Sequence, residues 1–230
     1  FGSVSELNTY PMAITSAGAI LSYVKDTQFS DLPHLRPPSL LIKAKTMTLD
    51  AVTLRNLEIV KTVGDSSKDT LFATLNRTST AGGSRKLKDW LLRPLHDLKK
   101  LNERHEAVQE LFDNTLSRRE IKDILKGFQD VERLVSRLGH GSISPRDLDS
   151  LRTSLNTLKD LKQFLSEEPL KSKLMKRLVK SIDPHKQVSK KLEEALVEEP
   201  PLVLRDGGIF KKGYSKELDD LRARASSGRE

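Results

Sequence analysis

Apolar residues recur every three or four positions along most of the chain, and this spacing predicts amphipathic helices. The clearest helix begins at Ser144, an N-cap that is followed by Pro145 at the first helical position and Asp147 at the third. About twenty residues follow, roughly 30 Å of helix. Its apolar face consists of leucines: Leu148, Leu151, Leu155, Leu158, Leu161 and Leu165. We expect this stripe to pack within the domain, because it is short for a coiled coil.

A second strong helix is predicted over residues 97–114. One of its faces gathers Leu98, Leu101, His105, Val108, Leu111 and Phe112. We expect His105 on this face to be a packed, hydrogen-bonded core residue, because a single histidine without partner ligands rarely marks a site. Further helices are predicted over residues 50–60, 121–128, 131–138, 169–182, 187–197 and 214–224.

Residues 70–95 combine a short helix, a turn rich in Ser, Thr and Gly, and a basic amphipathic helix that Pro94 ends. Thr80 is the predicted N-cap of the second helix, because its hydroxyl can accept an otherwise unpaired backbone N–H. Leu87 and Trp90 lie three positions apart on the apolar stripe. Since Trp90 is the only tryptophan, we expect it to be mostly buried and to anchor a core.

Two short segments carry β signals. Residues 40–49 include a local alternation of apolar and charged side chains, which predicts a half-buried strand. Residues 202–211 place Asp206, Gly207 and Gly208 between two short runs, and such residues supply the positive φ that a hairpin turn needs. The predicted fold class is therefore mainly α: a multi-helix domain with a short strand and a β-hairpin.

A proline-rich segment, residues 30–39, divides the chain. Pro33, Pro37 and Pro38 exclude a regular helix there, so the segment is a predicted linker and domain boundary. We expect residues 1–33 to form the end of one domain with its linker and residues 34–230 to form the second, larger part.

Composition narrows the classes of function. The chain has 230 residues, 36% of them hydrophobic, and no cysteine, which excludes disulfides, thiolate zinc sites and a cysteine nucleophile. No apolar run approaches the ~18 residues that would suggest a membrane span. The net charge of +8 favours polyanions. Because 32 acidic residues accompany 40 basic ones, this charge is modest evidence for contact with DNA.

The strongest electropositive cluster lies in the predicted helix over residues 169–182. Its members are Lys171, Lys173, Lys176, Arg177 and Lys180. They are the predicted residues for weak contacts with a DNA backbone, and the alternative is an ordinary solvated lysine face.

No pattern in the sequence predicts catalysis. The segment from Gly208 to Gly213 fits the first six positions of a phosphate-binding loop, but Tyr214 follows where that loop has lysine. The five histidines are dispersed, so a zinc site is not expected. We predict no catalytic, cofactor-binding or metal-ligating residue and no enzyme activity of the chain by itself.

The ordered motifs resemble the MutS family of DNA mismatch-repair proteins. The central signature comprises Thr78, Thr80, Gly83, Ser84, Arg85, Leu87, Trp90, Leu91, Pro94 and Leu95. Further matches in family order are Asp26-Thr27-Gln28, Leu32-Pro33-His34, Asp50 with Thr53, Asn56-Leu57-Glu58, Arg205-Asp206-Gly207-Gly208 and Gly213-Tyr214. The resemblance implies that residues 1–33 are the end of a connector domain and residues 34–230 a core, or lever, domain that stops before the clamp.

The same resemblance implies a mechanical function. The core of a MutS protein couples mismatched-DNA binding to an ATPase, and the mismatch-reading, clamp and ATPase domains are not recognisable in this chain. ATP and Mg²⁺ would serve the full-length protein, which is expected to be a cytoplasmic, nucleoid-associated homodimer that works with DNA and downstream repair proteins. Two alternatives remain open: a stand-alone basic helical module that binds nucleic acid non-specifically, and a helical protein–protein scaffold.

Overall fold

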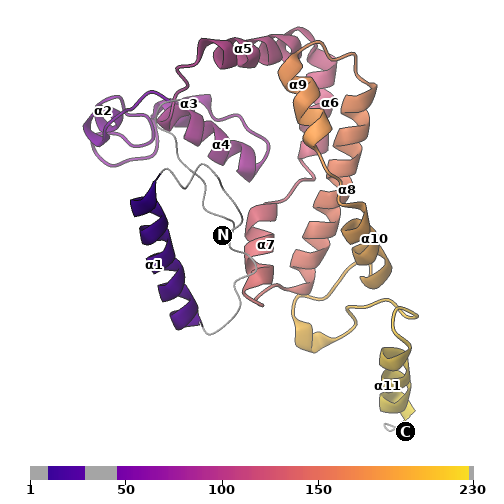
Figure 1. The fold of residues 1–230 in the computed structure, drawn as a ribbon. Coiled ribbons are helices and arrows are strands. Elements are labelled where there is room, and N and C mark those ends of the chain that lie inside the picture. Colours follow the sequence, from indigo (N-terminus) through magenta and orange to yellow (C-terminus); the bar gives the residue numbers. More distant parts are fainter. Residues whose placement is uncertain (1–9, 29–45, 228–230) are drawn as a thin grey trace.

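The computed structural model describes residues 10–28 and 46–227, and it is mainly helical (Figure 1). The helices are α1 (Pro11–Gln28), α2 (Ala51–Asn56), α3 (Leu71–Leu75), α4 (Ala81–Leu92), α5 (Leu98–Asp113), α6 (Thr115–Leu125), α7 (Val131–Gly139), α8 (Pro145–Glu167), α9 (Lys173–Ser181), α10 (Lys186–Ala195) and α11 (Lys216–Ser227). The predicted boundary at residues 33–34 lies outside the described residues. Within the described parts, no helix is long and apolar enough to cross a bilayer.

Helix α8 is the axis of a helical body, residues 97–197, in which α6, α7, α9 and α10 pack against it. Its predicted start is confirmed. The Ser144 hydroxyl accepts the N–H of Asp147 at 3.2 Å, and the Asp147 carboxylate accepts the N–H of Ser144 at 3.0 Å. The leucine stripe is confirmed as well, with four buried members: Leu151, Leu155, Leu161 and Leu165.

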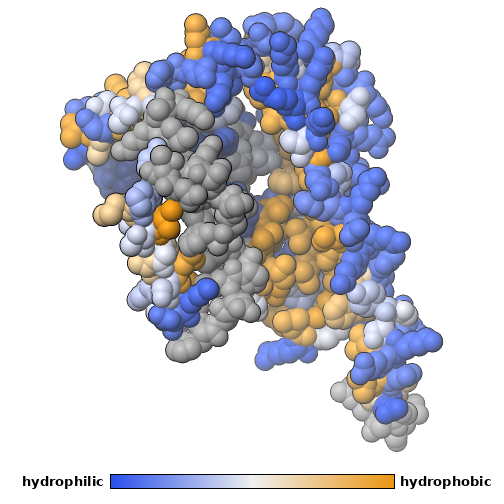
Figure 2. Space-filling model, viewed as in Figure 1, coloured by the Kyte–Doolittle hydropathy of each residue, from blue (hydrophilic) through white to orange (hydrophobic). Residues whose placement is uncertain are grey.

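Two apolar clusters hold this body together. The first joins α5, α8 and α9 through the buried residues Ala107, Leu161, Leu165 and Met175. The second joins α7 to α8 through the buried residues Leu134, Leu151 and Leu155. Figure 2 shows apolar side chains gathered on the visible surface over α7 and the adjoining half of α8. Part of α7 is therefore left uncovered, as the half-exposed Val135 and Leu138 indicate.

Helix α5 forms where the sequence predicts it, but the expected inner face is wrong. Leu98, Val108 and Phe112 are 71%, 64% and 67% exposed, and His105 is exposed too. The buried residue on the helix is Ala107, and Leu111 packs beside it in the first cluster. The apolar spacing gave the helix period correctly, whereas contacts with α9 decide which face turns inward.

A smaller lobe, residues 46–96, contains α2, α3 and α4. The predicted N-caps are confirmed at Asp50, which accepts the N–H of Thr53 at 2.7 Å, and at Thr80, which accepts the N–H of Gly83 at 3.0 Å. The helix after Asp50 ends at Asn56, earlier than predicted, because Glu58 adopts a positive φ of 46°.

Helix starts elsewhere follow polar caps more closely than apolar spacing. The helix predicted over residues 121–128 begins at Thr115, because Asn114 accepts the N–H of Ser117 at 3.1 Å. The helix predicted over residues 169–182 begins at Lys173 after the cap Ser172. Both starts show the hydroxyl or amide cap overriding the first apolar residue.

The predicted hairpin is wrong and the predicted strand finds no support, since the described residues contain no sheet. Residues 40–45 lie outside the described parts, and Thr46 forms only an isolated bridge with Leu95. In the second segment Leu204–Asp206 is a short 3₁₀ turn. Gly207 and Gly208 do have positive φ, but they join no hairpin strands.

The backbone of residues 209–211 pairs with the end of α10 in place of the predicted hairpin partner. The N–H of Val197 donates to Ile209 O at 3.0 Å, and the N–H of Lys211 donates to Ala195 O at 2.8 Å. Leu196 between them is buried, only 1% exposed, so its burial brings the two segments together. This pairing uses the backbone groups that a hairpin would have needed.

Arg152 of α8 fixes the segment after α10. Its guanidinium donates to the carbonyls of Leu196, Val197 and Glu198 at 3.4, 3.2 and 3.1 Å, and it also pairs with Asp149. Further along, Arg222 of α11 donates to Phe210 O at 3.2 Å. A continuous line of contacts therefore runs from α8 to α11.

Candidate functional site

The basic cluster predicted from the sequence lies on α9 and just before it. Lys171, Lys173, Lys176, Arg177 and Lys180 are all exposed. Lys171 precedes the helix and the other four lie on it, and their electrostatic surroundings differ. Arg177 is already paired with Glu103 of α5 at 2.6 Å, and this hydrogen bond lowers the pKa of Glu103. Arg177 is therefore the member least available to an external anion.

The start of α9 already holds a carboxylate. Glu110 of α5 accepts the backbone N–H of Ser172 at 3.0 Å and that of Lys171. These N–H groups belong to the positive end of the helix, where an anion is stabilised. Glu110 thus positions α9 against α5 and occupies the place where a phosphate could otherwise bind.

A shallow depression of about 660 Å³ is lined by residues of α5 and α9 and of the segment before α5. Its lining carries more cations than carboxylates and consists of Leu95, Asp97, Lys99, Lys100, Glu103, Arg104, Leu174 and Arg177. The sequence reasoning missed the contribution of Lys99, Lys100 and Arg104, although all three lie in one basic stretch at the start of the helix. The positive surface therefore extends from α9 onto α5.

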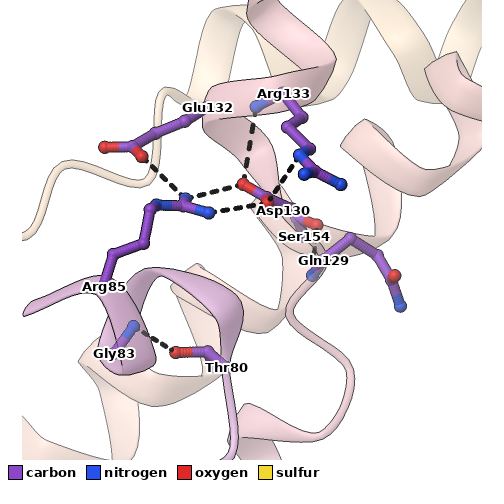
Figure 3. A network of polar contacts seen from close by, with 8 residues as sticks. All are labelled: Thr80, Gly83, Arg85, Gln129, Asp130, Glu132, Arg133 and Ser154. Carbon is purple, nitrogen blue, oxygen red and sulfur yellow. Dashed lines mark hydrogen bonds and ion pairs between the residues drawn. The ribbon is translucent and has the colours of Figure 1, made fainter. Parts of the chain in front are cut away.

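An arginine of the lobe binds the body at the start of α7 (Figure 3). Arg85 of α4 donates to both carboxylate oxygens of Asp130 at 2.8 Å each and lies 2.6 Å from Glu132. Asp130 is also the N-cap of α7, where it accepts the N–H of Arg133. We call Arg85, Asp130 and Glu132 the α4–α7 junction; it ties the direction of one helix to the cap of another.

The α4–α7 junction continues into the core of α8. The N–H of Gln129, next to Asp130, donates to the hydroxyl of Ser154 at 3.0 Å. Ser154 is completely buried and donates in turn to Ser150 O at 2.8 Å. The α4–α7 junction is thus linked, through the backbone of Gln129, to a buried side chain of the long helix.

The electrostatics of the junction follow from its geometry. The hydrogen bonds from Arg85 lower the pKa of Asp130 and raise the pKa of Arg85 above its ordinary value. The Asp130 side chain is 20% exposed, and those of Arg85 and Glu132 are 44% and 65% exposed. The contact is geometrically specific, but it lies partly in water, where breaking and reforming an ion pair costs little.

The glycine of the signature permits a close approach beside Thr80. A Cβ at Gly83 would lie 3.0 Å from the Thr80 hydroxyl and 3.5 Å from the Thr78 Cβ. The next residue, Ser84, accepts a hydrogen bond from the Asn76 amide at 3.1 Å. These residues fix the start of α4 and so orient Arg85 toward Asp130. Local structure therefore explains why the motif contains these residue types.

Trp90 does not anchor a core, and the prediction that it is mostly buried is wrong. The residue is 37% exposed, and the Arg104 guanidinium lies 3.9 Å from the centre of its ring. Burial lowers the pKa of Arg104. Trp90 therefore links α4 to α5 through a cation–π contact.

Among the described residues, neither a group of metal ligands nor a phosphate-binding loop before α11 is found. No three His, Asp or Glu side chains among them lie close enough to hold a metal ion. The loop before Gly213 is followed by Tyr214, and α11 begins only at Lys216, so no lysine and helix N-terminus meet at a phosphate site.

Comparison with known proteins identifies the chain's relatives. The family model described as MutS domain III matches residues 52–228. The DNA mismatch repair protein MutS of Methanosarcina acetivorans is 40% identical over 222 residues, which cover 95% of this chain and 25% of that protein. The protein of the same name from Pelotomaculum thermopropionicum is 38% identical over 234 residues, 100% of this chain and 27% of that protein. The chain spans about a quarter of the length of these curated relatives.

Proposed function

The chain belongs to the MutS family of DNA mismatch-repair proteins, and from this premise we propose that it is the structural core that couples mismatched-DNA binding to ATP hydrolysis in the full-length protein. One observation supports the proposal most directly. Arg85, an arginine of the family signature, binds the carboxylate of the N-cap residue of α7. This residue of the signature thus holds one helical unit against another.

The α4–α7 junction has the properties of a two-state contact. Its hydrogen bonds are bidentate and charged, which fixes orientation, yet Arg85 is partly exposed and needs no buried side chain to move when it releases Asp130. Coupling between distant sites needs such an element, with two arrangements that each site can bias.

The coupling role is tested by Arg85→Gln in the full-length protein. We expect mismatch affinity and unstimulated ATPase activity to change little, while the effect of mismatched DNA on the ATPase rate falls by roughly 5-fold or more. Asp130→Asn should reproduce the loss, because asparagine still caps α7 but no longer attracts Arg85.

Arg93→Gln is the matched control, since Arg93 caps the end of the same helix and its ion pair among the described residues is the local one with Asp89 at 3.0 Å. If Arg85→Gln and Arg93→Gln leave the DNA response equally intact in folded protein, the coupling role is contradicted. The open alternative, a protein–protein scaffold without a DNA role, would then be favoured.

We also propose weak, sequence-independent contacts between the α9 face and a DNA backbone. Lys176 and Lys180 are exposed, and neither has an ion-pair partner among the described residues. If both contact phosphates, Lys176→Ala with Lys180→Ala should reduce the slope of log affinity against log salt by about 2. The control is Lys122→Ala with Lys126→Ala, in which Lys122 lies on α6 and Lys126 is its C-cap residue. An unchanged slope would leave α9 as an ordinary solvated face.

On this proposal, ATP hydrolysis takes place in other parts of the full-length protein. We propose that ATP and Mg²⁺ act outside this chain, that the full-length protein is a homodimer in the cytoplasm near the nucleoid, and that residues 1–33 end a connector domain. The purified 230-residue chain should not hydrolyse ATP. Saturable turnover that a point change within this chain abolishes would contradict the assignment.

A further inference from the structure

The depression lined by α5, α9 and the segment before α5 contains both carboxylates and cations. Its two carboxylates are already engaged. Glu103 pairs with Arg177 at 2.6 Å, and Asp97 is the N-cap of α5, where it accepts the N–H of Lys100 at 3.2 Å. Within the described parts of the chain, neither carboxylate forms an ion pair with the other cations of the lining, so those cations leave the depression positively charged.

Three cations of the depression have no ion pair among the described residues: Lys99, Lys100 and Arg104. Glu103 acts on Lys99, and Asp89 on Arg104, only from longer distances. The two lysines are exposed in the first turn of α5, which carries no acidic residue and whose backbone N–H groups add partial positive charge. The depression therefore concentrates positive potential that attracts an anion.

Trp90 holds the guanidinium of Arg104 in place. The central guanidinium carbon lies 3.9 Å from the centre of the ring. An aromatic ring has no acceptor atom that could use up the N–H donors of an arginine, so donors remain for a ligand. Arg104 is half-buried, and burial lowers its pKa, so a bound anion would offset the cost of keeping its charge poorly solvated. Arg104 is thus a donor that is oriented before any ligand arrives.

The shape of the depression favours a compact anion over a long one. Its volume of about 660 Å³ lies within the range of about 300–1,000 Å³ that is typical of small-molecule sites. Asp97 and Glu103 belong to the same lining, so a duplex laid across the depression would bring further phosphates toward both carboxylates. A compact anion can contact the cations alone.

The available donors favour phosphate over carboxylate. Arg104 supplies a planar fork of N–H groups, and Lys99 and Lys100 supply two ammonium groups. Together they offer more donors than the two oxygens of one carboxylate can accept. A chain of phosphates brings several charges and many acceptor oxygens into a small volume, so it can use all three side chains at once.

We propose that Lys99, Lys100 and Arg104 bind the phosphate chain of a small oligophosphate, either free or as part of a nucleoside triphosphate. The site binds this chain without hydrolysing it, since hydrolysis belongs to other parts of the full-length protein. Arg104 also links α4 to α5 through Trp90. The ligand therefore binds at a contact between the lobe and the body.

Fluorescence of the 230-residue chain tests the site, because Trp90 is its only tryptophan. Titration with inorganic tripolyphosphate at constant ionic strength should give a saturable change in the emission of Trp90. Lys99→Ala with Lys100→Ala should weaken the apparent affinity ~10-fold or more, because two charged contacts with the ligand are lost. Lys122→Ala with Lys126→Ala removes the same charge near the end of α6 and should keep the affinity of the parent.

The full-length gene product gives a second readout that does not use tryptophan. Lysine acetylation is followed residue by residue by mass spectrometry, with and without tripolyphosphate. At about ten times the Kd, acetylation of Lys99 and Lys100 should slow roughly 10-fold, and that of Lys122 should not change. Arg104→Gln should remove most of this protection, although both lysines are still present.

Titration of the 230-residue chain with ATP distinguishes the two sources of the phosphate chain. If tripolyphosphate binds at least as tightly as ATP, the free chain is the ligand. If ATP binds ~10-fold more tightly, the nucleoside contributes to recognition as well.

Absence of both the emission change and the lysine protection would overturn the proposal. An equal loss of affinity in the Lys99/Lys100 variant and its control would do the same. Half-saturation by duplex DNA or by an oligoglutamate peptide at a lower concentration of charge than tripolyphosphate would overturn it in favour of a long polyanion or an acidic partner. None of these measurements records the response of the ATPase to mismatched DNA, so their failure is distinguishable from failure of the coupling role.

Discussion

The lobe and the α8 body are both helical, but different forces hold them. In the body, buried leucines of α8 meet side chains from several neighbouring helices. Among the described residues of the lobe, Ile59 and Thr70 are the buried ones, and α2, α3 and α4 have no buried member. The lobe is therefore organised by hydrogen bonds and the body by apolar burial.

Backbone hydrogen bonds hold together much of the lobe between Glu58 and α3. After Glu58 turns with positive φ, its carbonyl accepts the N–H of Leu71 at 3.1 Å, and the carbonyl of Ile59 accepts that of Phe72 at 2.9 Å. Thr70, only 1% exposed, then caps α3. Such contacts depend on particular side chains, whereas any well-shaped apolar residue can fill a core. The family signature accordingly lies in the lobe.

The largest expected effect is in the body. Leu155→Ala removes a residue that is 7% exposed in the second cluster, and we expect a loss of ~2–5 kcal/mol in the free energy of unfolding. Chemical denaturation measures it. Leu116→Ala, at a position 79% exposed, is the control and should change stability by less than about 0.5 kcal/mol. Equal losses would refute the division between core and surface.

Truncation of the lobe's tryptophan should cost less. Trp90→Ala loses a cation–π contact and a partly buried ring, together ~1–2 kcal/mol. Denaturation of the variant beside Leu155→Ala measures the difference. A loss as large as that for Leu155 would show that Trp90 anchors more than its contact with Arg104.

The cap of α4 should have a local effect. Thr80→Ala leaves the N–H of Gly83 without its acceptor, and we expect ~0.5–2 kcal/mol less stability in α4. Hydrogen exchange of the α4 amides should rise while that of the α8 amides stays unchanged. Thr80→Ser retains the hydroxyl and serves as control. Equal exchange in the Ala and Ser variants would contradict the capping role.

The smallest effect is the dependence of stability on pH at the α4–α7 junction. Arg85 lowers the pKa of Asp130 in the folded protein, so the ionised carboxylate stabilises the fold above its unfolded pKa of about 3.9. This contribution is lost as pH falls through the lower, folded pKa. Denaturation from neutral to acid pH should show a shallower decline for Asp130→Asn. Identical curves for parent and variant would mean that the ion pair adds no stability.

Capping residues were the most reliable guide from sequence to structure. Ser144, Asp50 and Thr80 were assigned correctly because each cap depends on atoms within three residues of it. The burial of the leucines in α8 was also predictable, because they recur every three or four residues along one face of a helix.

The faces of α5 and α4 could not be predicted in the same way. The orientation of α5 depends on a contact between its Glu110 and the N–H of Ser172 at the start of α9, about sixty residues later in the chain. Trp90 stays half-exposed because its partner, Arg104, comes from another helix. The hairpin failed for a similar reason, since the buried Leu196 offers residues 209–211 a partner outside the local sequence.

The hydrogen bonds of Arg152 also affect the direction in which α11 extends from the body. It grips three consecutive carbonyls after α10, and residues 209–211 and then α11 are supported in turn from that point. Twelve residues of α11 make an arm of about 18 Å, so an error of about 10° at its root would displace the far end by about 3 Å. Arg152, which is mostly but not fully buried, thus contributes to how accurately α11 is placed relative to α8.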